Sequence, residues 1–541
     1  MWEGPHGPED GDYCIAEVPE DGPAFLVEVL GADDSPQWDD RSVASQYRLR
    51  LRFPAQAERE AAAFGEPTGR ERRGRLDLRD LLVFTIDPED ARDHDDALSI
   101  RSLGRGRFEV GIHIADVSHY VHAGSALDRE AQLRGTSTYL PGGVIPMLPA
   151  RLSSELCSLR PDCDRLALSV IADLDAAGRL HDARFAETVV RSRHRLHYEE
   201  VQESLDGQRP LSGDLVQALE TLRGLARALR SGRHAAGALE LEVPEVKAWV
   251  DAQGAPVRIE RRAHLESHEL IEEFMLLANR CVGREGARRN AGLLYRVHDP
   301  PSPRKLEELD ATLKALGLPR IGHRDDPGRG LQTLLAVRLD PARRRLLHRM
   351  VLRSLARARY LERDTGHFGL GAREYCHFTS PIRRYPELHN HARVREWIRR
   401  RPSAAWDPAK LAQLADRCSA LEQTSTDAER EAVRVKGLRH LEGRLGEDAS
   451  GIITGLTPQG FFVELEETPV EGFVRVSHDM DDHFALDSSG VRLVGRRTRR
   501  RFVLGDAVRV TIARVDVLAR ECDMALEAPH RRSRRRHHGR G

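Results

Sequence analysis

Residues 84–97 read Phe84-Thr85-Ile86-Asp87-Pro88-Glu89-Asp90-Ala91-Arg92-Asp93-His94-Asp95-Asp96-Ala97. An apolar segment that favours a β-strand ends at Asp87, and further aspartates follow at positions 93, 95 and 96. Carboxylates crowded on a short loop repel one another unless a cation neutralises them. Mg²⁺ binds such oxygens, and two ions can hold the attacking and leaving oxygens of a phosphodiester. The loop therefore predicts a magnesium site, with Mn²⁺ as the alternative ion, made by Asp87, Asp93, Asp95 and Asp96.

Two other interpretations of this loop compete with a magnesium site. A calcium EF-hand requires Gly at its sixth loop position and Glu at its twelfth, and neither falls there when counting starts at Asp87 or Asp93. A solvated acidic loop is the second alternative. Apolar segments precede and follow the loop, so the carboxylates are expected at the edge of a core, and this favours a metal site.

Outward from this loop, residues 76–445 mix both kinds of secondary structure. Strand-like segments come first, at 82–86, 97–100, 108–115 and 167–174. Helical periodicity dominates later, at 264–283, 342–363, 393–401 and 411–441. This order predicts a large α+β domain of mixed sheet and helices.

Three smaller parts surround this domain. Residues 446–527 alternate apolar and polar side chains over short segments, which predicts a small β-barrel. Residues 1–75 predict a small acidic unit with two strands and two helices, and residues 528–541 form a basic tail. Residues 1–40 contain no Lys or Arg, and no acidic residue occurs from Pro529 onward. Although the net charge is −1, a polyanion is therefore expected to bind away from the N-terminus.

Several classes of protein do not fit the sequence. No segment approaches ~18 consecutive apolar residues, so we expect no membrane span. The chain starts with acidic residues where a signal peptide would be basic, and its seven cysteines form no C-x-x-C pair, which predicts a cytoplasmic protein. No P-loop occurs, so no nucleotide cofactor is expected, and neither a hydrolase elbow of the G-x-S-x-G type nor zinc-ligand spacing is present.

Two further segments carry candidate chemistry. In residues 377–385, Pro381 precedes the pair Arg383 and Arg384, whose guanidinium groups suit bidentate contact with phosphate. Tyr139 lies beside a Pro-Gly loop and either stacks on a base or belongs to the core. His113 and Asp116 could suggest a pair of metal ligands, but we interpret them as structural.

Four motifs together resemble the catalytic domain of the ribonuclease II and ribonuclease R family, over residues 76–440. They are Ile86–Ala97, His113-Ile114-Ala115-Asp116-Val117-Ser118, Tyr139-Leu140-Pro141 with Ile145–Pro149, and Phe378–Tyr385. The resemblance implies an RNB-type nuclease that degrades single-stranded RNA from a free 3′ end, processively and hydrolytically, to nucleoside 5′-monophosphates. It further implies that the four aspartates hold the metal, that Tyr139 stacks near the 3′ end of the RNA and that Arg383 holds the scissile phosphate.

Residues 446–527 resemble the S1-type OB-fold module of the same family, with Gly460-Phe461-Phe462-Val463 as its signature. Alternation along a strand puts Phe461 and Phe462 on opposite faces, so one ring can contact RNA while the other faces the core. At Arg475 the family often has His. Residues 1–75 have room for one small unit where the family commonly has two barrels, and a shortened OB barrel or a winged helix is expected there.

These observations favour a monomeric magnesium-dependent exoribonuclease. The alternative is a non-catalytic RNA-binding protein that keeps the nuclease fold as a scaffold, and the complete set of aspartates together with Arg383 argues against it. A third class, a small-molecule metal phosphoesterase, would need neither an RNA-binding barrel nor a basic tail.

Overall fold

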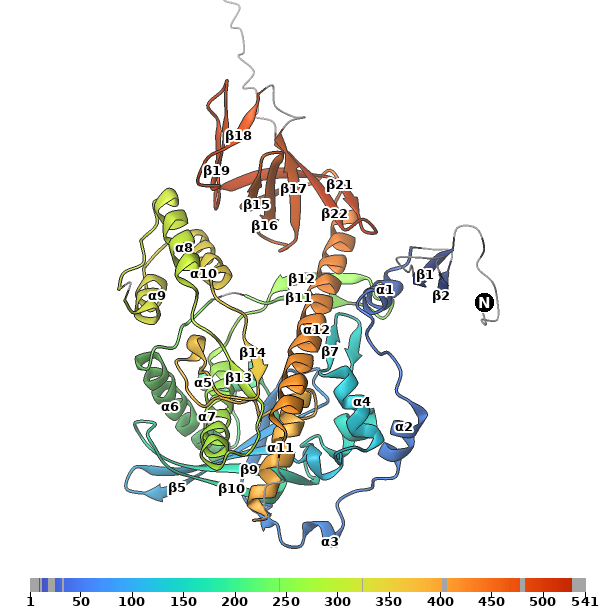
Figure 1. Cartoon of the computed structure of the whole chain (residues 1–541), viewed down its shortest axis with the longest axis vertical. Helices are drawn as coiled ribbons and strands as arrows, with labels where there is room; N and C mark the ends of the chain where they lie inside the picture. Colours follow the sequence, from blue (N-terminus) through green and yellow to red (C-terminus); the bar gives the residue numbers. More distant parts are fainter. Residues whose placement is uncertain are drawn as a thin grey trace, which may run out of the picture.

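A six-stranded sheet is the largest sheet of the middle domain in the computed structural model, and its strands lie toward the lower end of the domain in Figure 1. The structure describes residues 9, 12–17, 25–31, 34–242, 244–323, 325–400, 406–476 and 482–527, so the predicted basic tail lies outside the described residues. The sheet has the order β3 (Leu76–Asp77), β10 (Leu180–His197), β4 (Val83–Asp87), β5 (Asp96–Gly104), β6 (Arg107–Ala115) and β9 (Asp164–Asp175). The long strand β10 pairs with β9 along its first part and with β4 at its end.

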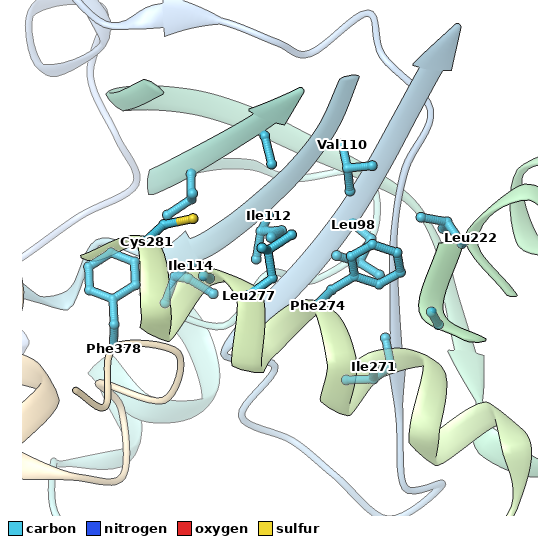
Figure 2. Packing of buried hydrophobic residues seen from close by; sticks show 14 of the residues in the cluster. Leu98, Val110, Ile112, Ile114, Leu222, Ile271, Phe274, Leu277, Cys281 and Phe378 are labelled. Carbon is cyan, nitrogen blue, oxygen red and sulfur yellow. The ribbon is translucent and has the colours of Figure 1, made fainter. Parts of the chain in front are cut away.

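Helices cover one face of this sheet and bury its apolar side chains. They are α5 (Tyr198–Leu205), α6 (Gly213–Ala235) and α7 (Glu266–Arg289). Figure 2 shows Phe274 and Leu277 of α7 packed beneath the strands that carry Leu98 and Ile112. Leu222 of α6 belongs to the same buried cluster. This packing fixes β4 and β5, the two strands that the acidic loop connects.

A second group of elements completes the middle domain. It comprises α4 (Ala126–Arg134), the hairpin of β7 (Thr138–Leu140) and β8 (Gly143–Ile145), and α11 (Tyr385–Ile398). The helix α12 (Pro408–Glu442) runs past this hairpin and leads to the C-terminal barrel (Figure 1). A further hairpin, β11 (Val246–Val250) with β12 (Pro256–Arg261), lies beside α12. Smaller helices α8 (Pro303–Leu316), α9 (Pro327–Leu335) and α10 (Pro341–Ser354) form their own apolar cluster.

One expected helix is shorter than its periodicity predicts. The predicted helix 342–363 ends at Ser354 in α10, and residues 359–361 form the strand β14 (Arg359–Leu361) instead. This strand pairs with β13 (Tyr295–Val297), and Tyr360 is buried in the core. Strand pairing across the chain therefore outweighs the local helical pattern after Ser354.

The C-terminal part is the expected small barrel. It closes in the order β15 (Asp448–Thr457), β16 (Gly460–Leu465), β17 (Glu471–Arg475), β22 (Glu521–Leu526) and β21 (Ala507–Asp516). A three-stranded sheet of β18 (Phe484–Leu486), β19 (Arg492–Gly495) and β20 (Arg501–Val503) extends it.

The N-terminal unit is small. Its described residues form a ribbon of β1 (Tyr13–Glu17) and β2 (Phe25–Gly31), followed by α1 (Asp39–Gln46), α2 (Ala55–Ala62) and α3 (Gly69–Arg72). A single two-stranded ribbon is less than a closed barrel, and the assignment of the unit to a shortened barrel or a winged helix stays a prediction. Over the described part of the chain, no helix has both the length and the apolar character that a membrane span requires.

Candidate active site

The acidic loop joins two neighbouring strands of the central sheet. Strand β4 is buried up to Ile86 and ends at Asp87, while β5 begins at Asp96 and is buried from Ala97. Both strands are fixed by the apolar cluster, so their ends hold Asp87 and Asp96 at the same edge of the sheet. The expectation that the carboxylates lie at the edge of a core is confirmed.

Asp95 is the most buried of the four aspartates. Its Oδ1 accepts a hydrogen bond from the backbone N–H of Ile382 at 2.9 Å, and its Oδ2 lies 3.6 Å from Nε of Arg383. Burial raises the pKa of Asp95 well above its ordinary value, and the charge of Arg383 opposes this rise. The structure thereby brings together two motifs that are separated by almost 300 residues in the sequence.

Asp96 and Asp87 influence each other electrostatically. Burial, and after it the negative charge of Asp87, raises the pKa of Asp96 to about 8. Asp87 itself accepts a 2.9 Å contact from Nδ1 of His94. The acidic loop therefore concentrates negative charge, and the neighbouring Arg and His side chains offset only part of it.

The donor chemistry at this edge fits a hard divalent cation. Carboxylate oxygens are the ligands that Mg²⁺ takes in proteins, and a cation would relieve the unfavourable burial of Asp95 and the repulsion between Asp87 and Asp96. Among the described residues, no three His, Cys, Asp or Glu side chains converge in a ready-made metal geometry. The identity of the ligands therefore stays a prediction that rests on donor type and charge.

Tyr139 stands opposite the acidic loop on the β7–β8 hairpin. Its hydroxyl donates to Oδ2 of Asp93 at 3.2 Å, and the residue is 38% exposed, so the core alternative for this residue does not apply. Its backbone N–H donates to Oε1 of Glu429 in α12 at 2.8 Å. The sequence reasoning missed Glu429, because nothing in the local pattern of a long helix indicates which of its polar residues faces the site.

The two arginines of the second motif differ in their surroundings. Arg383 is 40% exposed at its side chain, lies in ion-pair range of Asp95, and donates a hydrogen bond to Oγ of Ser380 at 3.1 Å. Arg384 is paired with the fully buried Glu387 and also donates to Ser380. Arg383 therefore remains available to a phosphate at the aspartates, whereas Arg384 uses its charge to hold the loop; its contact with RNA stays a prediction.

Another residue near the aspartates was not found from the sequence. Tyr198 follows β10, whose last residue, His197, pairs in register with Asp87. The charges of Asp96 and Asp87 contribute to raising the pKa of Tyr198, after burial as the main cause. Tyr198 lies near these aspartates because of the register of β10 against β4, and this register cannot be predicted from one sequence.

The structural interpretation of His113 and Asp116 agrees with the structure. His113 is buried between the hydroxyls of Ser99 and Ser169, and burial lowers its pKa to about 4. Asp116 is paired with Arg75 at 2.7 Å. Both side chains therefore already have protein partners away from the acidic loop.

The two phenylalanines of the barrel signature lie on opposite faces of β16, as predicted. Phe461 is fully buried and its ring lies 4.6 Å from that of Phe502. Phe462 is 37% exposed and packs beside Phe473 on the outer face. Phe461 is therefore a core residue, and of the two rings proposed for RNA binding only Phe462 remains a candidate.

Comparisons with known proteins agree with this geometry. A family model described as the RNB domain matches residues 75–400, and one described as the S1 RNA binding domain matches residues 444–527. Ribonuclease R from Thermotoga maritima is 38% identical over 542 residues, covering 96% of this chain and 76% of that protein. Ribonuclease R from Aquifex aeolicus is 37% identical, covering 91% of this chain and 70% of that protein.

A solved structure shares the architecture as well as the sequence. Mycoplasma genitalium RNase R in complex with ribose methylated single-stranded RNA superposes with a TM-score of 0.87 at 28% identity. The match covers 93% of this chain and 80% of that chain. The likeness thus extends over the middle domain and the barrel together.

Proposed function

The chain belongs to the RNB family of ribonucleases, and from this membership we propose how its residues divide the reaction among themselves. It is a 3′-to-5′ exoribonuclease, a hydrolase that shortens RNA. The substrate in this proposal is single-stranded RNA with a free 3′ end, which is degraded processively to nucleoside 5′-monophosphates. The protein acts as a monomer in the cytoplasm, where its scattered cysteines would stay reduced.

One observation carries the assignment of roles: the acidic loop, Arg383 and Tyr139 meet at one place although they come from three distant segments. Arg383 binds the phosphate next to the scissile bond, and Tyr139 stacks on a base near the 3′ end. Asp95 orients Arg383 and fixes the turn at Ile382. In this proposal the terminal phosphodiester lies against the carboxylates.

The carboxylates of Asp87, Asp93, Asp95 and Asp96 would hold Mg²⁺, or Mn²⁺ in its place. When bound, a pair of such ions supplies Lewis-acid stabilisation of the phosphate charge, as in two-metal hydrolysis. The high pKa of Asp96 and the burial of Asp95 support this proposal, because uncompensated carboxylates are costly in a core.

The runner-up is a non-catalytic RNA-binding protein on the same scaffold. Such a protein would have no need for a cluster of unneutralised carboxylates, yet all four aspartates and Arg383 are present. A phosphoesterase that acts on small molecules is disfavoured by the S1 barrel.

The direct test uses single-stranded RNA labelled at its 5′ end, with magnesium, with manganese and with a chelator. The proposal expects a ladder that shortens from the 3′ end, release of 5′-monophosphates, and loss of both with the chelator. RNA binding without shortening in any buffer would support the runner-up instead.

A further inference from the structure

The hairpin that carries Tyr139 is held by α12 at its first strand. Oγ1 of Thr138 and Oγ of Ser425 lie 2.9 Å apart, and Oε1 of Glu429 accepts the backbone N–H of Tyr139. These contacts fix where β7 starts. They do not fix the turn between β7 and β8, which consists of Pro141 and Gly142.

The turn is held from the other side by the N-terminal unit. Oδ2 of Asp40, in α1, accepts the backbone N–H of Gly142 at 2.6 Å. Space at this contact is tight, since a Cβ added at Gly142 would lie 2.7 Å from the same oxygen. Asp40 is thus the carboxylate against which the far end of the Tyr139 hairpin rests.

Helix α1 is itself anchored where it can serve as a fixed support. Asp39, next to Asp40, is buried between Lys436 and Arg439 of α12. Nζ of Lys436, which is almost fully buried, also donates to the carbonyls of Pro36 and Gly254 at 2.7 Å each. The start of α1 is therefore tied to α12 and to the β11–β12 hairpin, and Figure 1 shows α1 between α12 and the β1–β2 ribbon.

A contribution to the stability of the fold does not by itself explain the contact between Asp40 and Gly142. Burial raises the pKa of Asp40, and among the described residues no group donates to its buried second oxygen, Oδ1. A buried acceptor without a partner costs stability. The role of the Asp40 carboxylate is therefore better explained by positioning of the β7–β8 hairpin than by stabilisation of α1.

We propose that Asp40 is a positioning residue for the exonuclease reaction: through Gly142 it sets the distance between Tyr139 and the acidic loop, and so the length of RNA at which degradation stops. The inference rests on the proposed role of Tyr139. If the inference holds, the N-terminal unit contributes to the active site. Its helix α1 supports the hairpin of Tyr139, which lies about 100 residues further along the chain.

The test compares four variants of the full chain on 5′-labelled RNA, with one long oligomer and one at the length where the wild type stops. Asp40→Ala removes the acceptor, and Gly142→Ala forces the same contact apart from the other side. Asp40→Asn keeps an oxygen for the Gly142 N–H. Gly143→Ala is the matched control, since a Cβ there meets nothing within 4 Å and neither glycine needs a left-handed backbone.

We expect Asp40→Ala and Gly142→Ala to raise KM for the short oligomer by about threefold to tenfold, as part of a stacking contribution is removed. Their final products should shift in the same direction as those of Tyr139→Ala, while kcat on the long oligomer stays within about twofold of wild type. Asp40→Asn and Gly143→Ala should match the wild type. Added to Tyr139→Ala, Asp40→Ala should have no further effect, because both act through one ring.

Two results separate the inference from its premise. If Tyr139→Ala shifts the final products but Asp40→Ala and Gly142→Ala do not, or if the effects of Asp40→Ala and Tyr139→Ala simply add, Asp40 does not act through Tyr139 and the inference is wrong. If Tyr139→Ala itself leaves the final products unchanged, the proposed role of Tyr139 fails, and the inference fails with it.

Discussion

At the scale of residues, the burial of Asp95 explains why one carboxylate can matter to two motifs. One oxygen receives the Ile382 N–H, and the other faces Arg383. The sequence predicted both motifs and their chemistry, because an acidic loop after an apolar strand and an Arg pair after Pro are local patterns. Their contact could not be predicted, since it depends on how β5 and the start of α11 pack together.

Asp95→Asn should abolish most turnover while leaving RNA binding nearly intact. Asn keeps the shape and an acceptor for Ile382, but removes the charge that faces Arg383 and the proposed metal. Losing one strong electrostatic stabiliser costs roughly 3–4 kcal/mol in the barrier, or about 100-fold to 1,000-fold in rate. RNA affinity should stay within about tenfold, since we expect most phosphates to be bound outside the acidic loop. Single-turnover cleavage and equilibrium binding on one labelled oligomer measure both.

The matched control for this variant is Asp90→Asn in the same loop. Asp90 is 66% exposed at its side chain and pairs with Lys247 on the β11–β12 hairpin. The Asp90→Asn variant should cleave RNA at close to the wild-type rate. Equal rates for the Asp95 variant and the wild type would show that the metal site is assigned wrongly.

Tyr139 should determine the final product through its ring and not through its hydroxyl. A stacked base contributes ~1–3 kcal/mol, enough to retain a short remnant that makes few other contacts. Tyr139→Ala should therefore change the length distribution of the final products without abolishing degradation. Tyr139→Phe keeps the ring and removes only the 3.2 Å hydrogen bond to Asp93, so its products should resemble those of the wild type. Denaturing gels at complete reaction show which group matters.

At the scale of elements, sequence patterns predicted the type of an element better than its end. The helices expected at 264–283 and 411–441 are present as α7 and α12, with bounds shifted by a few residues. The helix expected at 342–363 stops early because β14 finds a partner, β13, more than 60 residues before it. Periodicity is a local property, whereas the end of this helix is decided by a distant strand.

Strand β16 offers a prediction with an internal control. Phe462→Ala removes a partly exposed ring and should weaken binding of single-stranded RNA by ~1–3 kcal/mol, with a much smaller loss of melting temperature than Phe461→Ala. Phe461→Ala removes a ring from the barrel core, and such truncations cost roughly 3–5 kcal/mol of stability. Binding isotherms and thermal unfolding of both variants separate the two roles. If Phe462→Ala binds RNA as tightly as the wild type, RNA contacts another face of the barrel.

At the scale of the whole molecule, the barrel is attached to the middle domain by specific ion pairs. Glu464, on the same strand as Phe462, binds Arg261 of the β11–β12 hairpin at 2.8 Å and Arg349 of α10 at 2.6 Å. Residues near the end of α12 share an apolar cluster with the barrel. These contacts orient the outer face of β16 relative to the domain that holds the aspartates. We expect RNA affinity to depend mainly on the barrel and the chemical step on the middle domain.

Removal of residues 446–541 should therefore weaken RNA binding without a matching loss of chemistry. Binding of phosphates releases counterions, and for single strands the slope of log affinity against log salt becomes shallower by about 0.7 for each phosphate that is no longer bound. The truncated protein should bind a long oligomer more weakly and with a flatter salt dependence. Its saturating turnover on a short oligomer should change much less, because Asp95, Arg383 and Tyr139 all remain. Since truncation uncovers apolar residues of α12, circular dichroism must first show that the middle domain is folded. A folded truncation with unchanged affinity and salt slope would mean that the middle domain alone holds the RNA.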